Sequence, residues 1–230
     1  MEKGGILEKV ASRRERAKEE KMRRILAAGA KLFSLHGFDG TTVQQIANEA
    51  DVAVGTLFLY VLDKGEILLL LFHHAIEEQL KLATKELNKG KRLIPAIHRF
   101  LMEMMEPYEK NMELSKFFWR EFLFHKGKVR GELDLLTGSL LRALSDKIVA
   151  SRDKQEIAAD VDVDAVALEM YAIYHSTLAF YLANCLPNSS PSDTLEALLQ
   201  AAWKGLEPRD EIEKHRNQGK RQPLKSKRPN

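Results

Sequence analysis

Two groups of histidine and glutamate side chains are the residues best suited to chemistry in this 230-residue chain. Imidazole and carboxylate groups at helical spacing can hold metal ions, and di-iron helical bundles do so with paired Glu-x-x-His motifs. The sequence contains no such motif, and the same residues suit the solvated face of a helix. We therefore expect no metal site and no cofactor. The two groups are His73, His74, Glu77 and Glu78, and Glu121 with His125.

Other signatures of catalysis are also missing from the sequence. It has no Gly-rich phosphate loop, no nucleophile elbow and no Cys-His metal spacing. Cys185 is the single cysteine, so no disulfide can form within the chain, which is compatible with a reducing cytosol. The first 20 residues lack the apolar core of a signal peptide, and the apolar run Ile67–Phe72 is too short to span a membrane. We expect a cytoplasmic protein that is not an enzyme and has no catalytic residues.

Positive charge gathers near the two ends of the chain, although the formal net charge is only +3. Between Lys9 and Lys31, nine Lys and Arg side chains face three Glu side chains, which indicates a basic arm and a basic first helix. After Glu213 the chain is basic and is interrupted by prolines, a pattern typical of a solvated, disordered tail. We expect the arm over residues 1–17 and the tail over 208–230, and we place no site in the tail.

The spacing of apolar residues is helical throughout, so the sequence predicts an all-α fold. A first helix should end near His36, because Gly37 suits the left-handed residue at a helix C-terminus. A short second helix follows Gly40, with a capping box formed by Thr41 and Gln44 or by Thr42 and Gln45. A third helix is expected from about Val54 to Val61, with Leu57 and Val61 in the core. The long first helix must cover these two short ones, which predicts a helix-turn-helix over residues 41–60.

A longer helical region should follow this three-helix unit. Asp63 is expected to cap a connector helix that reaches about Asn88. Gly127 and Gly131 are expected to mark breaks between later helices. The later helices are predicted at 95–108, 113–124, 133–152, 164–186 and 194–206. We expect a three-helix domain over residues 18–78 and a second helical domain over residues 79–207.

The segment Arg24–Leu71 resembles the DNA-binding domain of the tetracycline-repressor (TetR) family over its whole length. Each motif that carries the likeness is weak alone, but their order and spacing together are specific. The motifs are His36-Gly37-Phe38, Thr41-Thr42-Val43, Ile46-Ala47, Ala50, and Gly55-Thr56-Leu57-Phe58-Leu59-Tyr60 followed by Lys64. The resemblance implies a transcriptional regulator, with repression as the expected mode. It also implies a DNA-binding domain over residues 18–78 and an effector-binding and dimerisation domain over residues 79–207. The alternative is an all-helical ligand-binding or partner-binding protein that does not bind DNA.

The resemblance also assigns roles in binding double-stranded DNA. It implies phosphate contacts from Thr42, Thr56, Tyr60 and Lys64, and base-edge contacts from Val54, Gly55 and Phe58. Thr42 could instead only cap its helix, while Tyr60 and Phe58 could only pack. Ala53 stands where the family commonly has a capping serine, Val54 where it has a polar residue and Phe58 where it has tyrosine. We therefore expect apolar contacts with thymine methyl groups and shape readout, with added contacts from the arm between Arg13 and Arg24.

The last two helices are expected to form a homodimer. Residues 166–186 are apolar on nearly every side, and a helix of that kind is buried all round. In the TetR family the final two helices of each subunit form the dimer interface, and two-fold symmetry suits a near-palindromic operator. A monomeric bundle is the alternative. The stripe on the final helix is Leu195, Leu198, Leu199, Ala202, Trp203 and Leu206.

Aromatic and methionine side chains are crowded in the middle of the chain and predict a pocket for a small apolar effector. Each of them alone would more often be ordinary core. The resemblance is what favours a cavity, and the connector helix starting at Lys64 would link that cavity to the DNA-binding domain. The predicted ligand-binding residues are Met102, Met105, Phe118, Trp119, Phe122, Tyr171, Tyr174 and His175.

Overall fold

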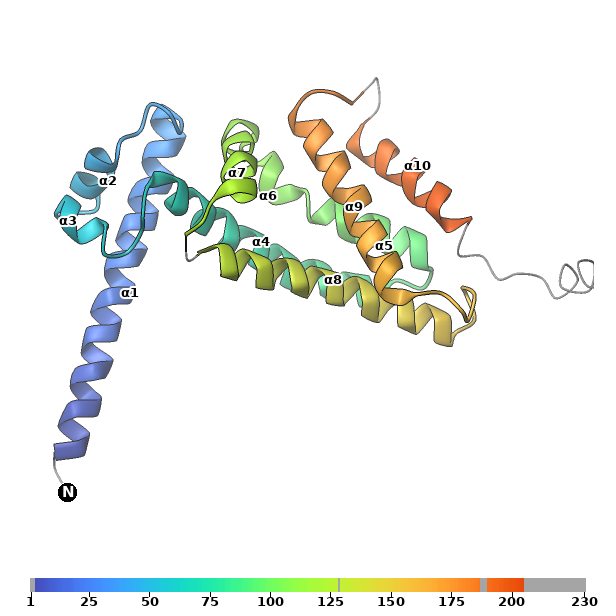
Figure 1. Cartoon of the computed structure of the whole chain (residues 1–230), viewed down its shortest axis with the longest axis horizontal. Helices are drawn as coiled ribbons and strands as arrows, with labels where there is room; N and C mark the ends of the chain where they lie inside the picture. Colours follow the sequence, from blue (N-terminus) through green and yellow to red (C-terminus); the bar gives the residue numbers. More distant parts are fainter. Residues whose placement is uncertain (1–2, 128, 187–189, 205–230) are drawn as a thin grey trace, which may run out of the picture.

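The computed structural model describes residues 3–127, 129–186 and 190–204, with side chains described from Arg14 onward. These residues form helices and connecting turns, so the predicted all-α fold is confirmed. Figure 1 shows a three-helix head beside a larger bundle, with one long helix running from the head into the bundle. The predicted tail over 208–230, together with Leu206, lies outside the described residues.

The head consists of α1 (Lys3–His36), α2 (Val43–Glu49) and α3 (Val54–Leu57). Helix α1 begins at Lys3, so most of the segment expected to be an arm is continuous with the first helix. Gly37 ends α1 at φ 72°, the left-handed conformation that its position required. Of the two predicted capping boxes, the structure contains the one formed by Thr42 and Gln45.

The third helix is shorter than predicted. It ends at Leu57, and residues 58–60 continue as turns, with Leu59 N–H donating to the Thr56 carbonyl and Tyr60 N–H to the Leu57 carbonyl. Both expected core residues are buried, Leu57 at 0% exposure and Val61 at 2%. Val61 N–H still donates to the Leu57 carbonyl, so the two side chains remain one turn apart on the core side.

Helix α4 (Lys64–Lys89) is the connector and belongs to both parts of the molecule. The Asp63 side chain accepts a hydrogen bond from Glu66 N–H, as predicted for a cap. Helix α4 crosses α1 at Gly29, where an added Cβ would lie 2.6 Å from Ile67 Cγ2. A glycine is therefore needed at this crossing.

The bundle contains α5 (Leu93–Glu103), α6 (Glu106–Glu109), α7 (Met112–Phe124), α8 (Val129–Asp153), α9 (Val163–Leu182) and α10 (Pro191–Trp203). The single helix predicted over 95–108 is divided into α5 and α6. Pro107 explains the division, because it has no N–H to donate to the Glu103 carbonyl. The predicted break at Gly131 is wrong, since Gly131 lies within α8. Helix α9 begins at Val163, one residue before the predicted start, and Asp162 caps it by accepting from Ala165 N–H.

None of the helices in the described ranges is long and apolar enough to cross a membrane.

The close crossing of α1 and α4 is testable with Gly29→Ala. The added methyl group meets Ile67, and overpacking should lower the free energy of unfolding by about 1–3 kcal/mol in urea denaturation. Gly138→Ala is the matched control, because nothing lies within 4 Å of an added Cβ in α8. That control should be neutral or stabilising by up to about 1 kcal/mol. Equal effects of the two substitutions would contradict the crossing geometry.

Candidate DNA interface and effector pocket

The residues predicted to contact DNA lie on or beside the two short helices of the head. Thr42 is exposed while its side chain caps α2, so capping leaves its hydroxyl at the surface. Gly55 is exposed, and nothing would lie within 4 Å of an added Cβ there. Val54, Thr56 and Tyr60 are partly buried. The surface around α3 is therefore accessible to a groove of duplex DNA.

Apolar side chains are exposed just after α3. Phe58 is 49% exposed, so it does not fill the small core of the head. Leu59 is 80% exposed, and sequence reasoning did not single it out. The sequence does contain a signal for the exposure of Leu59. Helical spacing places Leu57 and Val61 in the core, so the apolar residues between them have no buried position to fill.

Arg24, in the arm expected to touch DNA, stabilises the turn of the helix-turn-helix. Its guanidinium donates to the carbonyls of Ala50 and Asp51 and lies 3.1 Å from the Asp51 carboxylate. Asp51 has a φ of 52°, so this contact helps hold a strained turn residue. Arg23 pairs with Glu20 at 2.6 Å, whereas Arg14 and Arg16 are exposed.

Lys64 has a structural role that the sequence did not reveal. Its ammonium donates to the carbonyls of Phe38 at 2.8 Å and Thr41 at 3.0 Å, and lies 4.5 Å from the centre of the Phe38 ring. These contacts fasten the loop before α2 to the start of α4. An ammonium has three donors, so a phosphate contact would use the one that remains.

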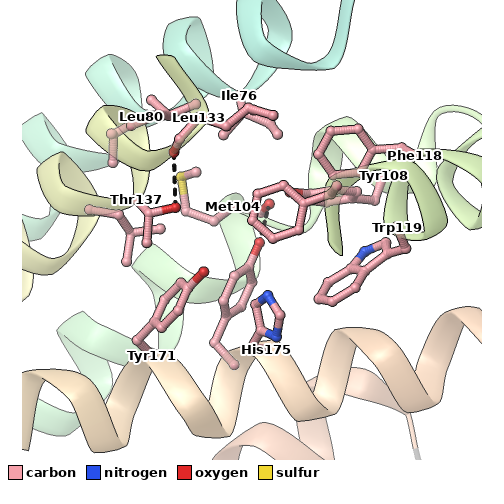
Figure 2. Close-up of a pocket in the computed structure, with 14 residues that line it drawn as sticks. Ile76, Leu80, Met104, Tyr108, Phe118, Trp119, Leu133, Thr137, Tyr171 and His175 are labelled. Carbon is pink, nitrogen blue, oxygen red and sulfur yellow. Dashed lines mark hydrogen bonds between the residues drawn. The ribbon is translucent and has the colours of Figure 1, made fainter. Parts of the chain in front are cut away.

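The described part of the bundle encloses a cavity of about 40 Å³ between α4, α6, α7, α8 and α9 (Figure 2). Six of the eight residues predicted to bind a ligand line it: Phe118, Trp119, Phe122, Tyr171, Tyr174 and His175. Met105, which is buried in the core, and Met102, which lies beside a separate groove with His98 and Ser192, do not line it. Met104 is the methionine that lines the cavity. Sequence reasoning also missed the aliphatic wall, although Leu133, Leu136 and Leu140 have the spacing of one helix face.

Two of the four hydroxyl groups around the cavity donate to backbone carbonyls. Tyr174 donates to the Met104 carbonyl at 2.9 Å, and Thr137 donates to the Leu133 carbonyl at 3.0 Å. Burial raises the pKa of Tyr108 and of Tyr174, so both phenols stay protonated at neutral pH. Burial also lowers the pKa of His175, which favours the neutral imidazole. The walls therefore carry no ionised group at neutral pH.

Helix α7 contacts both the head and the cavity. On one side, the Phe117 ring stacks on Phe38 of the head with centroids 4.9 Å apart, and the Arg120 guanidinium lies 5.1 Å from the Phe117 centroid. On the other side, Phe118 lines the cavity and stacks on Phe72 of α4 at 4.5 Å. A displacement of α7 would therefore change both its packing on the head and the shape of the cavity.

A buried carboxylate makes a second link between head and bundle. Glu66 is 4% exposed and its carboxylate accepts from Leu62 N–H at 2.6 Å and from Val129 N–H at 3.4 Å. Leu62 precedes α4, and Val129 begins α8. The Glu66 side chain thus bonds both to the end of the head and to the first turn of α8, a helix that lines the cavity.

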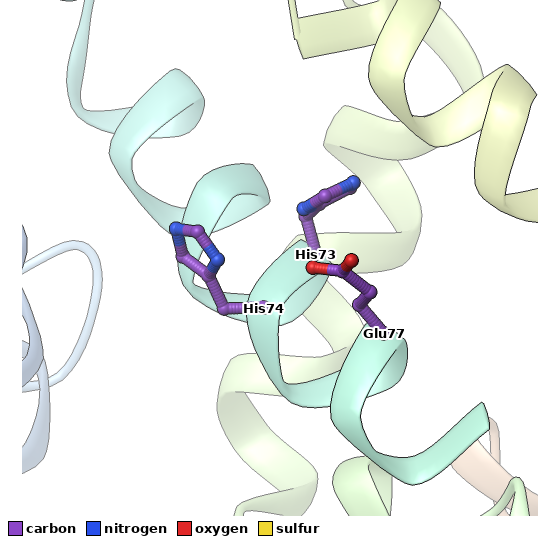
Figure 3. A group of neighbouring side chains, drawn as sticks. All are labelled: His73, His74 and Glu77. Carbon is purple, nitrogen blue, oxygen red and sulfur yellow. The ribbon is translucent and has the colours of Figure 1, made fainter. Parts of the chain in front are cut away.

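His73, His74 and Glu77 lie together on α4, with their ligand atoms within 4.8 Å of one another (Figure 3). Glu77 also pairs with Lys81 at 3.2 Å, and this contact lowers the pKa of Glu77. Among the described residues, Glu121 and His125 do not join this group. Glu121 instead bonds to Arg120.

Residues 25–71 match the family model described as "Bacterial regulatory proteins, tetR family". The chain belongs to the TetR family. Its head is thus the DNA-binding domain of a TetR-family transcriptional regulator.

Curated TetR-family regulators show the likeness in sequence. The transcriptional regulator HbdR of Aromatoleum sp. (strain CIB) is 41% identical over 59 residues, which is about a quarter of each protein (26% of both). The transcriptional repressor KstR of Rhodococcus jostii (strain RHA1) is 25% identical over 183 residues, covering 79% of this chain and 81% of that protein.

Solved structures share the fold. FadR of Thermus thermophilus, a TetR-family repressor in complex with lauroyl-CoA, superposes with a TM-score of 0.67 at 20% identity and covers 82% of this chain and 96% of that one. FadR of Bacillus subtilis, in complex with stearoyl-CoA, gives a TM-score of 0.61 at 17% identity, covering 77% and 95%.

The contacts of Lys64 are testable with Lys64→Met, which keeps the aliphatic stem but removes the donors. Loss of two charge-assisted bonds should lower the free energy of unfolding by about 1–3 kcal/mol. If Lys64 acts on DNA through the loop, affinity for duplex DNA falls while the slope of log K against log salt stays unchanged. A slope smaller by about 0.9 would instead show a lost phosphate contact. Lys85→Met, exposed on the same helix, is the stability control.

Proposed function

We propose that the protein is a homodimeric transcriptional repressor that binds a near-palindromic operator and releases it when an apolar ligand enters the α4–α9 cavity. The observation that carries this proposal is the position of α7, which packs on the head through Phe117 and lines the cavity through Phe118. Binding to chromosomal DNA would place the protein in the cytoplasm. We propose no enzymatic activity.

The head supports the DNA-binding part of this proposal. Thr42, Thr56 and Tyr60 supply hydroxyl groups for phosphate oxygens, and Val54, Gly55 and Phe58 present a mainly apolar surface to base edges. Exposed Phe58 and Leu59 suit contacts with thymine methyl groups. Few hydrogen-bond donors are left to read bases directly, so groove shape should contribute to specificity.

The outer faces of α9 and α10 support the dimer. Three large apolar side chains are exposed there: Leu168 at 57%, Phe180 at 55% and Leu198 at 41%. Exposed apolar residues gathered on adjacent helices mark an interaction surface. A second copy bound by two-fold symmetry would cover them and would present two heads to the two halves of an operator.

The cavity supports a ligand with an apolar chain. Its walls combine aliphatic side chains from α4 and α8 with aromatic ones from α7 and α9. FadR proteins of the same fold were crystallised with lauroyl-CoA and stearoyl-CoA. We therefore take long-chain acyl thioesters as the first class of effector to test.

The small size of the cavity suggests how a ligand would cause release of the operator. It measures about 40 Å³, whereas ligand sites usually enclose about 300–1,000 Å³. A ligand must therefore separate the surrounding helices, and α7 is the one that also touches the head. If the closed form binds the operator, a ligand that selects the wider form weakens operator binding.

The proposal is tested by selecting duplexes from a random pool with the purified full-length protein, then titrating lauroyl-CoA against the selected site. We expect a near-palindrome, salt-dependent binding by a dimer, and a fall in operator affinity of roughly 5- to 150-fold on addition of the thioester. Palmitoyl-CoA and free coenzyme A serve as the chain-length and headgroup controls. Absence of duplex binding even at low salt would overturn the proposal and favour a ligand-binding protein that does not bind DNA.

A further inference from the structure

The polar groups around the cavity restrict the chemistry of what can enter it. Among the lining residues there is no Asp, Glu, Lys or Arg. An ionised group buried there would lose its hydration without gaining a counter-ion, which is strongly unfavourable. The nearby Arg130 is already occupied, since it forms an ion pair with Asp134 at 2.9 Å and donates to the Phe122 carbonyl. The cavity therefore favours an uncharged ligand segment.

One donor in the cavity wall has no acceptor. The indole N–H of Trp119 is buried and has no hydrogen-bond partner among the described residues. It contrasts with the hydroxyls of Tyr174 and Thr137, which already donate to backbone carbonyls. A buried donor without a partner is destabilising, and a ligand acceptor placed against it would remove that cost.

Trp119 and His175 stand together at one end of the cavity, with ring centroids 4.2 Å apart (Figure 2). The aliphatic wall from Leu133 to Leu140 extends along α8 for about 10 Å, given a rise of about 1.5 Å per residue. The cavity thus combines the unpaired indole N–H of Trp119 with an aliphatic wall suited to a hydrocarbon chain.

We propose that the buried part of the ligand is an uncharged, flexible hydrocarbon chain that carries a carbonyl oxygen, and that this oxygen accepts a hydrogen bond from Trp119 Nε1. Esters, thioesters and ketones fit this description, whereas free fatty acids, ionised at neutral pH, do not. The inference rests on the proposed function in one respect, namely that the cavity is the ligand site.

The test changes the indole N–H of Trp119 alone. This is feasible because the chain has two tryptophans, of which the other can be replaced. Trp203 lies in α10 and does not line the cavity, so Trp203→Phe gives a parent protein in which Trp119 is the single tryptophan. Expressing this parent with benzothienylalanine in place of tryptophan exchanges the N–H for sulfur and keeps the ring shape. Binding of 2-dodecanone and of laurate is then measured by calorimetry at pH 7.5, without DNA.

We expect the parent to bind 2-dodecanone at least about 100-fold more tightly than laurate, because the carboxylate would be buried unpaired. We expect the sulfur analogue to lower the affinity for 2-dodecanone by roughly 2- to 10-fold. Comparable affinities for laurate and the ketone, an unchanged affinity in the analogue, or binding of neither compound would each overturn the inference.

These outcomes are separate from those that test the proposed function. If 2-dodecanone binds in a Trp119-dependent way but no acyl compound releases the operator, the inference stands and the repressor mechanism fails. If lauroyl-CoA releases the operator equally well from the parent and the sulfur analogue, the repressor mechanism stands and the role of Trp119 fails.

Discussion

The first turn of α4 must pack in two domains at once, and this constraint shapes the rest of the molecule. Ile67 fills the crossing with α1 at Gly29, while the ammonium of Lys64 holds the loop before α2. In the same turn, the buried carboxylate of Glu66 bonds to Leu62 on the head side and to Val129 on the bundle side. The head therefore cannot tilt freely about a hinge. A change in its position must disturb contacts that α7 and α8 make with the start of α4.

Helix α7 links the head to the cavity. Four of its aromatic residues divide between two faces, with Phe117 on the head and Phe118, Trp119 and Phe122 on the cavity. Because the cavity measures only about 40 Å³, a ligand gains space by moving its walls. Packed interiors do not deform continuously, so such a movement is expected to select a second arrangement of the helices.

Much of the head was predictable from sequence, because its signals are local. The capping box at Thr42, the left-handed Gly37 and the buried pair Leu57 and Val61 each depend on neighbours within a few residues. The cavity was predicted only in part, because tertiary packing decides which side chains meet around it. Trp119 and His175 line the cavity, whereas Met105 does not. The contacts of Arg24 and Lys64 could not be predicted, because each joins residues more than 20 positions apart, and a basic side chain beside a helix-turn-helix suggests DNA first.

The coupling between cavity and head is the central claim, and the distance between the two heads of the dimer tests it most directly. Asn48, exposed on α2, would be changed to Cys and spin-labelled in a Cys185→Ser background, which removes the native exposed thiol. Pulsed electron paramagnetic resonance would then record the distance between labels with and without lauroyl-CoA. The account predicts a shifted distance distribution in the otherwise unaltered protein and a smaller shift in Phe117→Ala, which removes the stack on Phe38 but no residue that lines the cavity. An unchanged distribution with lauroyl-CoA bound would contradict it.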